Sequence, residues 1–334
     1  FDKVGSTYYV YDGTKIFAYE KGNRQVYFDM KELKPYLPEY LAKDDVLYTF
    51  RLSQMDMYKD GKLYVAGLVF VQTDDNENYY GYTYNLIFSI DQNKSVEIIN
   101  KKLARKNSRP KGFVWYETAS GGPEDIIVWK DGVKLYNYAK YVVKPHFSFT
   151  NDGTMIYLFQ EYDTPPANYV GYVYSNTVQV IARKNGEETL LYSWHDSALK
   201  VAIRAKYEYG NIYDYQMPTL EGNILHIWSG TVFHHTVDIT SKTMLTNELS
   251  DDFLLERPRV RLGKILFLNE SGIFTVTPTE DGKYDYFHLV WAYDTGEKVR
   301  YVIDHDYDGK YCYVLDPTQR IIFQITTNMP NNQS

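Results

Sequence analysis

Short runs in which apolar and polar residues alternate recur along the whole chain, and they predict antiparallel β-strands. Many of these runs come in pairs, with an acidic or polar residue and a glycine between the two. Glycine supplies the positive φ that a tight hairpin needs, and Asp or Asn before it tolerates the same conformation. The pattern therefore predicts a protein built largely of β-hairpins. The clearest are YYVYDGTKIFAY around Gly13, MDMYKDGKLYVAG around Gly61 and FSFTNDGTMIYLF around Gly153.

Four weaker copies complete a series that repeats at about 50 residues, which is the length of a four-stranded propeller blade with its loops. They surround Gly112, Gly222, Gly263 and Gly309. A third strand-like run follows most of the hairpins. We therefore predict an all-β β-propeller, most simply of seven blades of about four antiparallel strands, in which each glycine turn joins the first and second strands of a blade. Six or eight blades remain open, because residues 205–217 (AKYEYGNIYDYQM) contain an additional hairpin-like segment.

The repeats span residues 1–334 and predict a single propeller domain. Residues 30–43 (MKELKPYLPEYLAK) follow a helical period that Pro35 and Pro38 interrupt, so we expect a short helical linker between the first two blades. Residues 328–334 form a polar tail after the last strand-like run. Because that run is only the third of its unit, the ring must close by borrowing a strand or by packing its first blade against its last.

Aromatic residues are unusually abundant: the 334 residues include 35 Tyr, 16 Phe and 5 Trp, a composition that suits pleated strands. The repeat motif resembles that of the YVTN, TolB and WD40-like β-propellers. Asp60-Gly61-Lys62-Leu63-Tyr64-Val65 is the best match, although the Ser-Pro expected before Asp-Gly is absent from every copy and no blade ends in Trp-Asp. The resemblance implies a rigid binding scaffold, commonly outside the cytoplasm, and does not fix an activity.

The charge and the cysteine content exclude several classes of function. A formal net charge of −7 argues against general binding to nucleic acid or anionic lipid, since both need a cationic surface. No apolar run is long enough to cross a bilayer, so we expect no membrane insertion. Cys312 is the only cysteine, which excludes an intrachain disulfide and a cysteine-based zinc site.

One segment suggests a metal site. Asp304, Asp306 and Asp308 alternate before Gly309, as in the first half of a calcium-binding loop. The twelfth position of such a loop is Leu315, where a Glu ligand would be expected, and the segment also coincides with a predicted hairpin turn. Calcium is thus the one cofactor that we consider, and a solvated turn is the alternative.

Ligand binding is predicted on three long connections that lie opposite the glycine turns: residues 73–82, 118–125 and 161–169. Long loops on a rigid scaffold are usual carriers of recognition, and tyrosines supply broad contact area at low entropic cost. The alternative is that these loops are merely tolerated insertions. The predicted ligand-binding residues are Tyr79, Tyr80, Tyr82, Tyr162 and Tyr169.

No catalytic motif is present: the chain has no G-x-S-x-G, P-loop or dinucleotide-binding fingerprint. The leading hypothesis is therefore a non-enzymatic scaffold that binds a protein or a glycan, in an extracellular, cell-surface or virion setting. Two alternatives stay open. One is a propeller glycosidase or lyase with acids at the central channel. The other is a purely structural assembly subunit.

Overall fold

A computed structural model describes the strands and turns that are needed to define the fold. The described residues are 2–37, 47–74, 78–110, 114–116, 126–130, 133–138, 143–162, 176–195, 215–229, 233–248, 256–261, 264–269, 272–278, 284–291, 304–307, 311–316 and 321–326.

The described part of the chain is almost entirely β-structure, and its strands form seven antiparallel sheets. Each sheet consists of strands that are consecutive in the sequence and paired in simple up-and-down order. The first two are four-stranded: β1 (Asp2–Val4), β2 (Thr7–Tyr11), β3 (Lys15–Glu20) and β4 (Asn23–Asp29); then β5 (Leu47–Met57), β6 (Leu63–Asp74), β7 (Asn78–Ile90) and β8 (Val96–Pro110).

A small third sheet, in the order β11-β10-β9, lies in the sequence between the first two sheets and the remaining four. Its strands are β9 (Val114–Tyr116), β10 (Ile126–Lys130) and β11 (Val133–Tyr138). Two four-stranded sheets follow: β12 (His146–Phe149), β13 (Met155–Tyr162), β14 (Asn176–Lys184) and β15 (Glu187–His195); then β16 (Tyr215–Glu221), β17 (Ile224–Ser229), β18 (Phe233–Asp238) and β19 (Thr243–Glu248).

The last two sheets differ in size. One has four strands: β20 (Glu256–Arg261), β21 (Lys264–Asn269), β22 (Gly272–Pro278) and β23 (Tyr284–Trp291). The other has three: β24 (Asp304–Tyr307), β25 (Tyr311–Asp316) and β26 (Ile321–Thr326).

The linker between the first two sheets contains the 3-10 helix η1 (Met30–Tyr36). Asp29 caps it: the Asp29 carboxylate accepts a hydrogen bond from Lys31 N, and Glu32 accepts one from Asp29 N, which together make a capping box. Met30 and Leu33 are buried against the first two sheets. The helix covers the first half of the predicted 30–43 linker, and residues 38–43 lie outside the described residues, as does the 328–334 tail.

Neighbouring sheets pack face to face through separate apolar layers. Ile16, Phe28 and Leu33 meet Val69 and Phe88 between the β1–β4 and β5–β8 sheets. The other face of the β5–β8 sheet packs on the β12–β15 sheet, whose second face packs on the β16–β19 sheet. Both faces of an inner sheet are thus buried, which explains why every residue of β7 from Thr83 to Ile90 is buried. This stack of consecutive antiparallel sheets is a propeller-type architecture.

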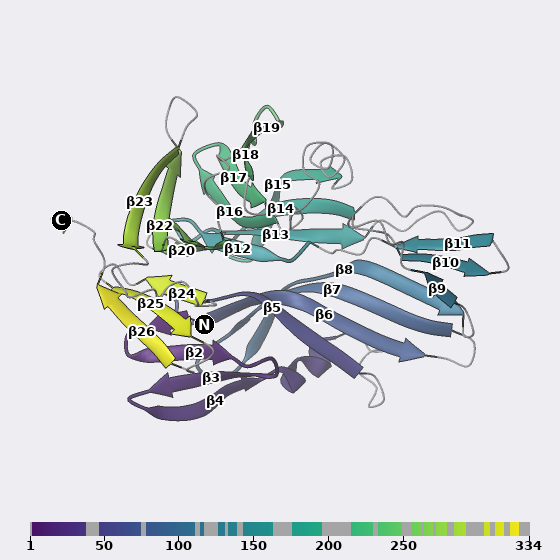
Figure 1. The fold of residues 1–334 in the computed structure, drawn as a ribbon, viewed down its shortest axis with the longest axis horizontal. Helices are drawn as coiled ribbons and strands as arrows, with labels where there is room; N and C mark the ends of the chain where they lie inside the picture. The colour runs from purple at the N-terminus through teal and green to yellow at the C-terminus, as the bar shows by residue number, and fades with distance from the viewer. Residues whose placement is uncertain are drawn as a thin grey trace.

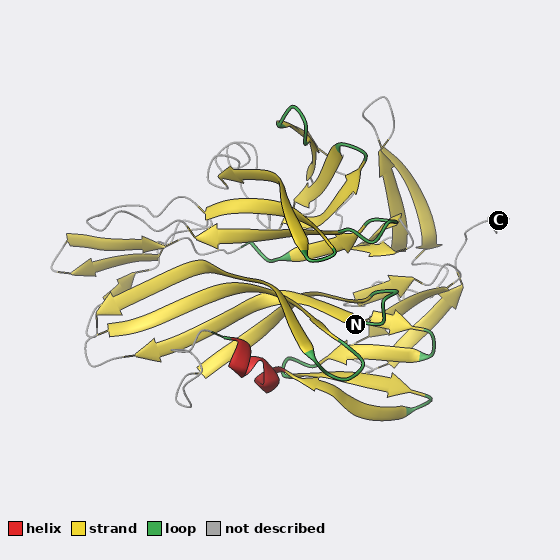
Figure 2. Ribbon diagram, turned by 180° about the vertical axis from the view of Figure 1, so that it is seen from behind, coloured by secondary structure: helices red, strands yellow, loops and turns green. Residues whose placement is uncertain are grey.

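The first strands of six sheets lie next to one another in a cyclic order. β1 lies against β5 and β24, β12 against β5 and β16, and β20 against β16 and β24. The β9–β11 sheet is not part of this series, because β8 packs directly on β13 and β5 on β12. Figures 1 and 2 show the β9–β11 sheet at one end of the molecule, beyond the ends of β7, β8 and β13.

Four of the seven predicted glycine turns fall within the described residues, and all four glycines have positive φ: Gly13 (103°), Gly61 (78°), Gly153 (87°) and Gly222 (57°). The turns at Gly61, Gly153 and Gly222 join the first and second strands of their sheets, as predicted. The prediction is wrong for Gly13, which joins β2 to β3, because the short strand β1 precedes that hairpin.

The weak copy around Gly112 does not form a hairpin. The run that precedes it ends β8, which pairs with β7, whereas the run that follows is β9, which pairs with β10. Alternating residues were mistaken there for the two arms of one hairpin, since a strand pattern does not identify its partner. No helix among the described residues has the length and apolar composition needed to span a membrane.

Candidate functional site

Because neighbouring strands run in opposite directions, the connections between them lie alternately at the two ends of each sheet. The turns at Gly61 and Gly153 lie at one end, which we call the turn end, and Lys59 Nζ of one turn donates to Asn151 O of the other at 3.3 Å. The connections β6–β7 and β13–β14 begin and end at the opposite end, which we call the distal end. The β9–β11 sheet also joins the chain there, between the end of β8 and the start of β12 (Figure 1). Two of the three connections predicted to bind ligand, those between β6 and β7 and between β13 and β14, therefore belong to the distal end.

The first of these connections is shorter than predicted. Thr73 and Asp74 belong to β6 and residues 78–82 belong to β7, so that only residues 75–77 connect the two strands. Tyr79 pairs with Asp74, Tyr80 with Thr73 and Tyr82 with Val71. The prediction of a long loop was wrong because Tyr and Thr favour strands, and the polar residues among them extend the hairpin without interrupting it.

Tyr82 packs against the layer between the first two sheets. It is half-buried, and its ring stacks on Tyr84 with centroids 6.5 Å apart and an interplanar angle of 27°. Its ring therefore contributes to core packing as well as to the surface. Among the other predicted residues, Tyr79, Tyr80 and Tyr162 lie on strands whose side chains at these positions are not described, and Tyr169 lies outside the described residues, as does 118–125. Ligand binding by the five tyrosines stays a prediction.

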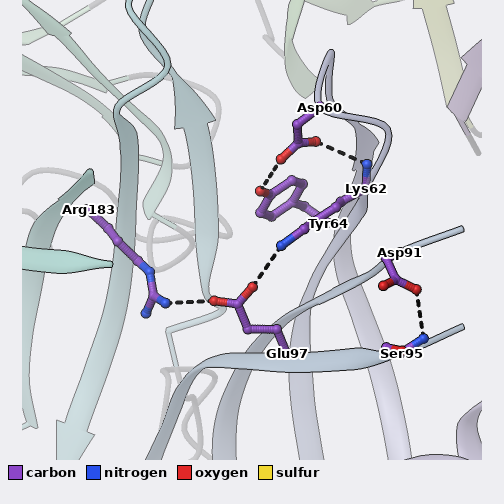
Figure 3. Close-up of polar contacts among 7 residues, drawn as sticks. All are labelled: Asp60, Lys62, Tyr64, Asp91, Ser95, Glu97 and Arg183. Carbon is purple, nitrogen blue, oxygen red and sulfur yellow. Dashed lines mark hydrogen bonds and ion pairs between the residues drawn. The ribbon is translucent and has the colours of Figure 1, made fainter. Parts of the chain in front are cut away.

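At the turn end, charged side chains join two sheets (Figure 3). Glu97 on β8 accepts hydrogen bonds from Lys62 Nζ at 2.9 Å and from Arg183 on β14 at 2.8 Å. Asp60 accepts a hydrogen bond from the Tyr64 hydroxyl at 2.7 Å. The Lys62 hydrogen bond, more than the nearby Arg183, lowers the pKa of Glu97, and Glu97 in turn raises the pKa of Lys62. These partly exposed groups hold the β5–β8 sheet to the β12–β15 sheet.

Beneath that surface, buried and partly buried polar groups cross the same seam. Gln54 on β5 donates to Phe147 O at 2.8 Å and accepts from Phe147 N at 3.0 Å. Asn85 donates to Gln160 O, and the Gln160 side chain accepts from Val143 N at 2.5 Å. Asn85 and Gln160 are fully buried. The amides therefore fix how the two sheets align.

Two buried carboxylates lie on adjacent first strands. Asp2 on β1 accepts a hydrogen bond from Met57 N on β5, and Asp56 accepts one from Gln54. The sequence alone does not predict these roles for Asp2, Gln54 and Asp56. Local alternation gives no signal for them, because polar and apolar residues alternate over 54–57 (QMDM) and such a pattern predicts that the polar side chains face solvent.

The predicted calcium segment is partly a strand. Asp304 and Asp306 lie on β24 opposite Leu315 and Tyr313 of β25, and Asp308 lies outside the described residues. In the part of the chain that the structure describes, no three His, Cys, Asp or Glu side chains are grouped as metal ligands would be. The β24 side chains are not among those described, so calcium binding stays a prediction.

Comparisons with known proteins give only distant likenesses. No protein-family model matches the chain, and no curated protein matches it. Among solved structures, BamB from Moraxella catarrhalis is similar at 12% identity and a TM-score of 0.31, with 83% of this chain and 88% of that chain covered. Apo AztD from Citrobacter koseri is similar at 11% identity and a TM-score of 0.34, with 96% and 94% covered. At such TM-scores the architecture rests on the sheets described above.

Proposed function

We propose that this protein is a non-enzymatic binding scaffold, built on a six-bladed propeller, that recognises a partner protein with its distal end. The observation that carries the proposal is the β9–β11 sheet, a structured insertion at the distal end of a framework that packs without it. In repeat architectures, insertions on one face are frequent carriers of binding.

The count of six blades is supported by the cyclic order of first strands. The order β1, β5, β12, β16, β20, β24 returns to β1, and it omits the β9–β11 sheet. Closure would then occur by packing of β24 on β1. A seventh blade, which the sequence spacing favoured, would have to stand between the β5–β8 and β12–β15 sheets, where β8 and β13 are already in contact.

The buried acids favour a scaffold over a glycosidase or a lyase. Asp2 and Asp56 each accept a hydrogen bond that fixes backbone or a neighbouring side chain. A catalytic acid pair must instead flank an open space that admits the substrate. We therefore propose binding, in the extracellular or cell-surface setting expected for this class, with a glycan as the alternative ligand.

The distal end can be tested by removing the insertion. Residues 111–142 would be replaced by a short Gly-Asn linker. Binding would be measured by affinity capture from the native source, with the wild-type protein and the deletion variant as separate baits. The proposal expects an unchanged melting temperature and loss of the captured partners. A matched control replaces the turn 91–95 at the turn end and should keep them. Retained capture by the folded deletion variant would contradict the proposal.

A further inference from the structure

Among the strands that the structure describes, the last sheet has no fourth strand on its outer side. The β24–β26 sheet has three strands, whereas the other five sheets of the cyclic series each have a fourth, outer strand: β4, β8, β15, β19 and β23. None of the strands that the structure describes pairs with the outer edge of β26. That edge presents a row of backbone N–H and C=O groups that can accept another strand.

The outer edge of β26 lacks the features that protect the other outer strands from pairing. The ladders of β4, β8, β15 and β23 each contain a register shift, and β19 ends in Glu248. Residues 321–326 (IIFQIT) carry no charge, and they pair with β25 without a shift. Charges and bulges are the usual devices that prevent strand addition, and β26 has neither.

The next residues of the chain are poor candidates for this position. Residues 327–334 read TNMPNNQS, in which Pro330 has no N–H to donate and the three asparagines disfavour a strand. A hairpin back along β26 would also use the first of these residues for its turn. A strand from another molecule can occupy the position.

We propose that this strand is β26 of a second copy, paired antiparallel across a two-fold axis. An uncharged strand can pair with itself without the repulsion that like charges opposite each other produce. The outer strands of the two flanking sheets also carry exposed apolar side chains: Phe287 on β23 is 40% exposed and Val26 on β4 is 51% exposed. Figure 1 shows β23, β26 and β4 along one side of the molecule.

The test is the oligomeric state of the full chain across a concentration series, measured by sedimentation velocity. We expect a concentration-dependent dimer. The exposed β26 residues Gln324 and Thr326 would be changed together to Lys, which should yield a monomer with the wild-type circular dichroism spectrum. The matched control is Leu245→Lys on the outer strand β19, which is 62% exposed and should leave the dimer intact.

A covalent readout tests the pairing directly. In a two-fold antiparallel ladder one residue lies opposite itself, at a Cα separation of about 5 Å that a disulfide can span. Oxidation should therefore cross-link Phe323→Cys or Gln324→Cys, but not Leu245→Cys, and Cys312 is buried. A wild-type chain that stays monomeric would overturn the proposal. So would a dimer that survives both lysines or that neither cysteine cross-links.

Discussion

Gln54 is bound to the backbone of Phe147 in both directions, although the two residues lie in different sheets. Its Nε2 donates to Phe147 O at 2.8 Å, and its Oε1 accepts from Phe147 N at 3.0 Å. The side-chain amide thus takes the place of a strand's peptide group between β5 and β12. The Phe147 N–H and C=O would lose these hydrogen bonds if the two sheets shifted relative to each other. The pairing therefore fixes the alignment of the two sheets.

Replacing Gln54 with Leu should destabilise the protein by about 2–4 kcal/mol, because an unpaired buried polar group costs roughly 1–3 kcal/mol. Urea unfolding followed by tryptophan fluorescence measures this. Gln25 on β4 is exposed, and its change to Leu should have almost no effect. Equal effects of the two changes would show that the Phe147 hydrogen bonds contribute nothing.

Gly67 on β6 pairs with Leu52 of the neighbouring strand β5, next to a register shift in β5. A Cβ at this position would overlap Arg51 O and the Phe50 ring. Gly67→Ala should therefore lower the free energy of unfolding by about 1–3 kcal/mol, the usual range for overpacking. Gly22→Ala meets no atom within 4 Å but has a φ of 82°, so it separates the cost of a left-handed backbone, about 1 kcal/mol, from the cost of a clash. A Gly67→Ala variant as stable as wild type would mean that β5 moves aside freely.

Burial lowers the pKa of His235 to about 4. In the unfolded chain His235 binds a proton near pH 6.5, whereas in the folded chain it does so only near pH 4. Stability is therefore full above pH 6.5 and falls as the pH drops towards 4. The shift corresponds to about 3 kcal/mol at most. Unfolding free energies measured from pH 7.5 to pH 4.5 should fall less steeply in a His235→Gln variant. Parallel curves would refute the assignment.

Glu97 bridges Lys62 and Arg183, and its change to Gln should cost only about 0.5–1 kcal/mol, since exposed ion pairs contribute little. The loss should shrink in high salt, which screens exposed charges. Glu187 is exposed on β15, and Glu187→Gln serves as the comparison. A large loss that is insensitive to salt would mean that Glu97 acts through packing.

If Asp304, Asp306 and Asp308 bind calcium, a chelator should lower the melting temperature and calcium should restore it, because a ligand of the folded state stabilises by mass action. Differential scanning calorimetry of wild type and of Asp306→Asn measures both. The variant should not respond to calcium. A wild-type curve that is the same with chelator and with calcium would favour the solvated turn.

Local patterns predicted the strands well, since alternation and turn chemistry act within a few residues. The hairpins at Gly61, Gly153 and Gly222 follow directly from this. The alternating pattern does not show which strands pair across a connection. It therefore predicts a hairpin around Gly112 that β8 and β9 do not form, and it does not predict the short strand β1. Sheet partners depend on packing between distant residues.

The candidate site likewise has one part that the sequence predicts and another that it does not. The sequence predicts a binding surface opposite the glycine turns because polar connections are visible along the chain, and the strand directions place the β6–β7 and β13–β14 connections at that end. The amide link between Gln54 and Phe147 joins residues 93 positions apart, and neither has a motif that would suggest it. Buried polar seams are set by the register between sheets, which alternation alone does not specify.

The direct packing of β8 on β13 has a consequence for how this protein can vary. Because the framework is continuous beneath the β9–β11 sheet, the inserted segment behaves thermodynamically as a loop, and doubling a loop's length costs only about 0.6 kcal/mol. Sequence and length can therefore drift at this position while the surrounding layers stay intact. The junction between β8 and β12 is accordingly the natural place to graft a foreign recognition module.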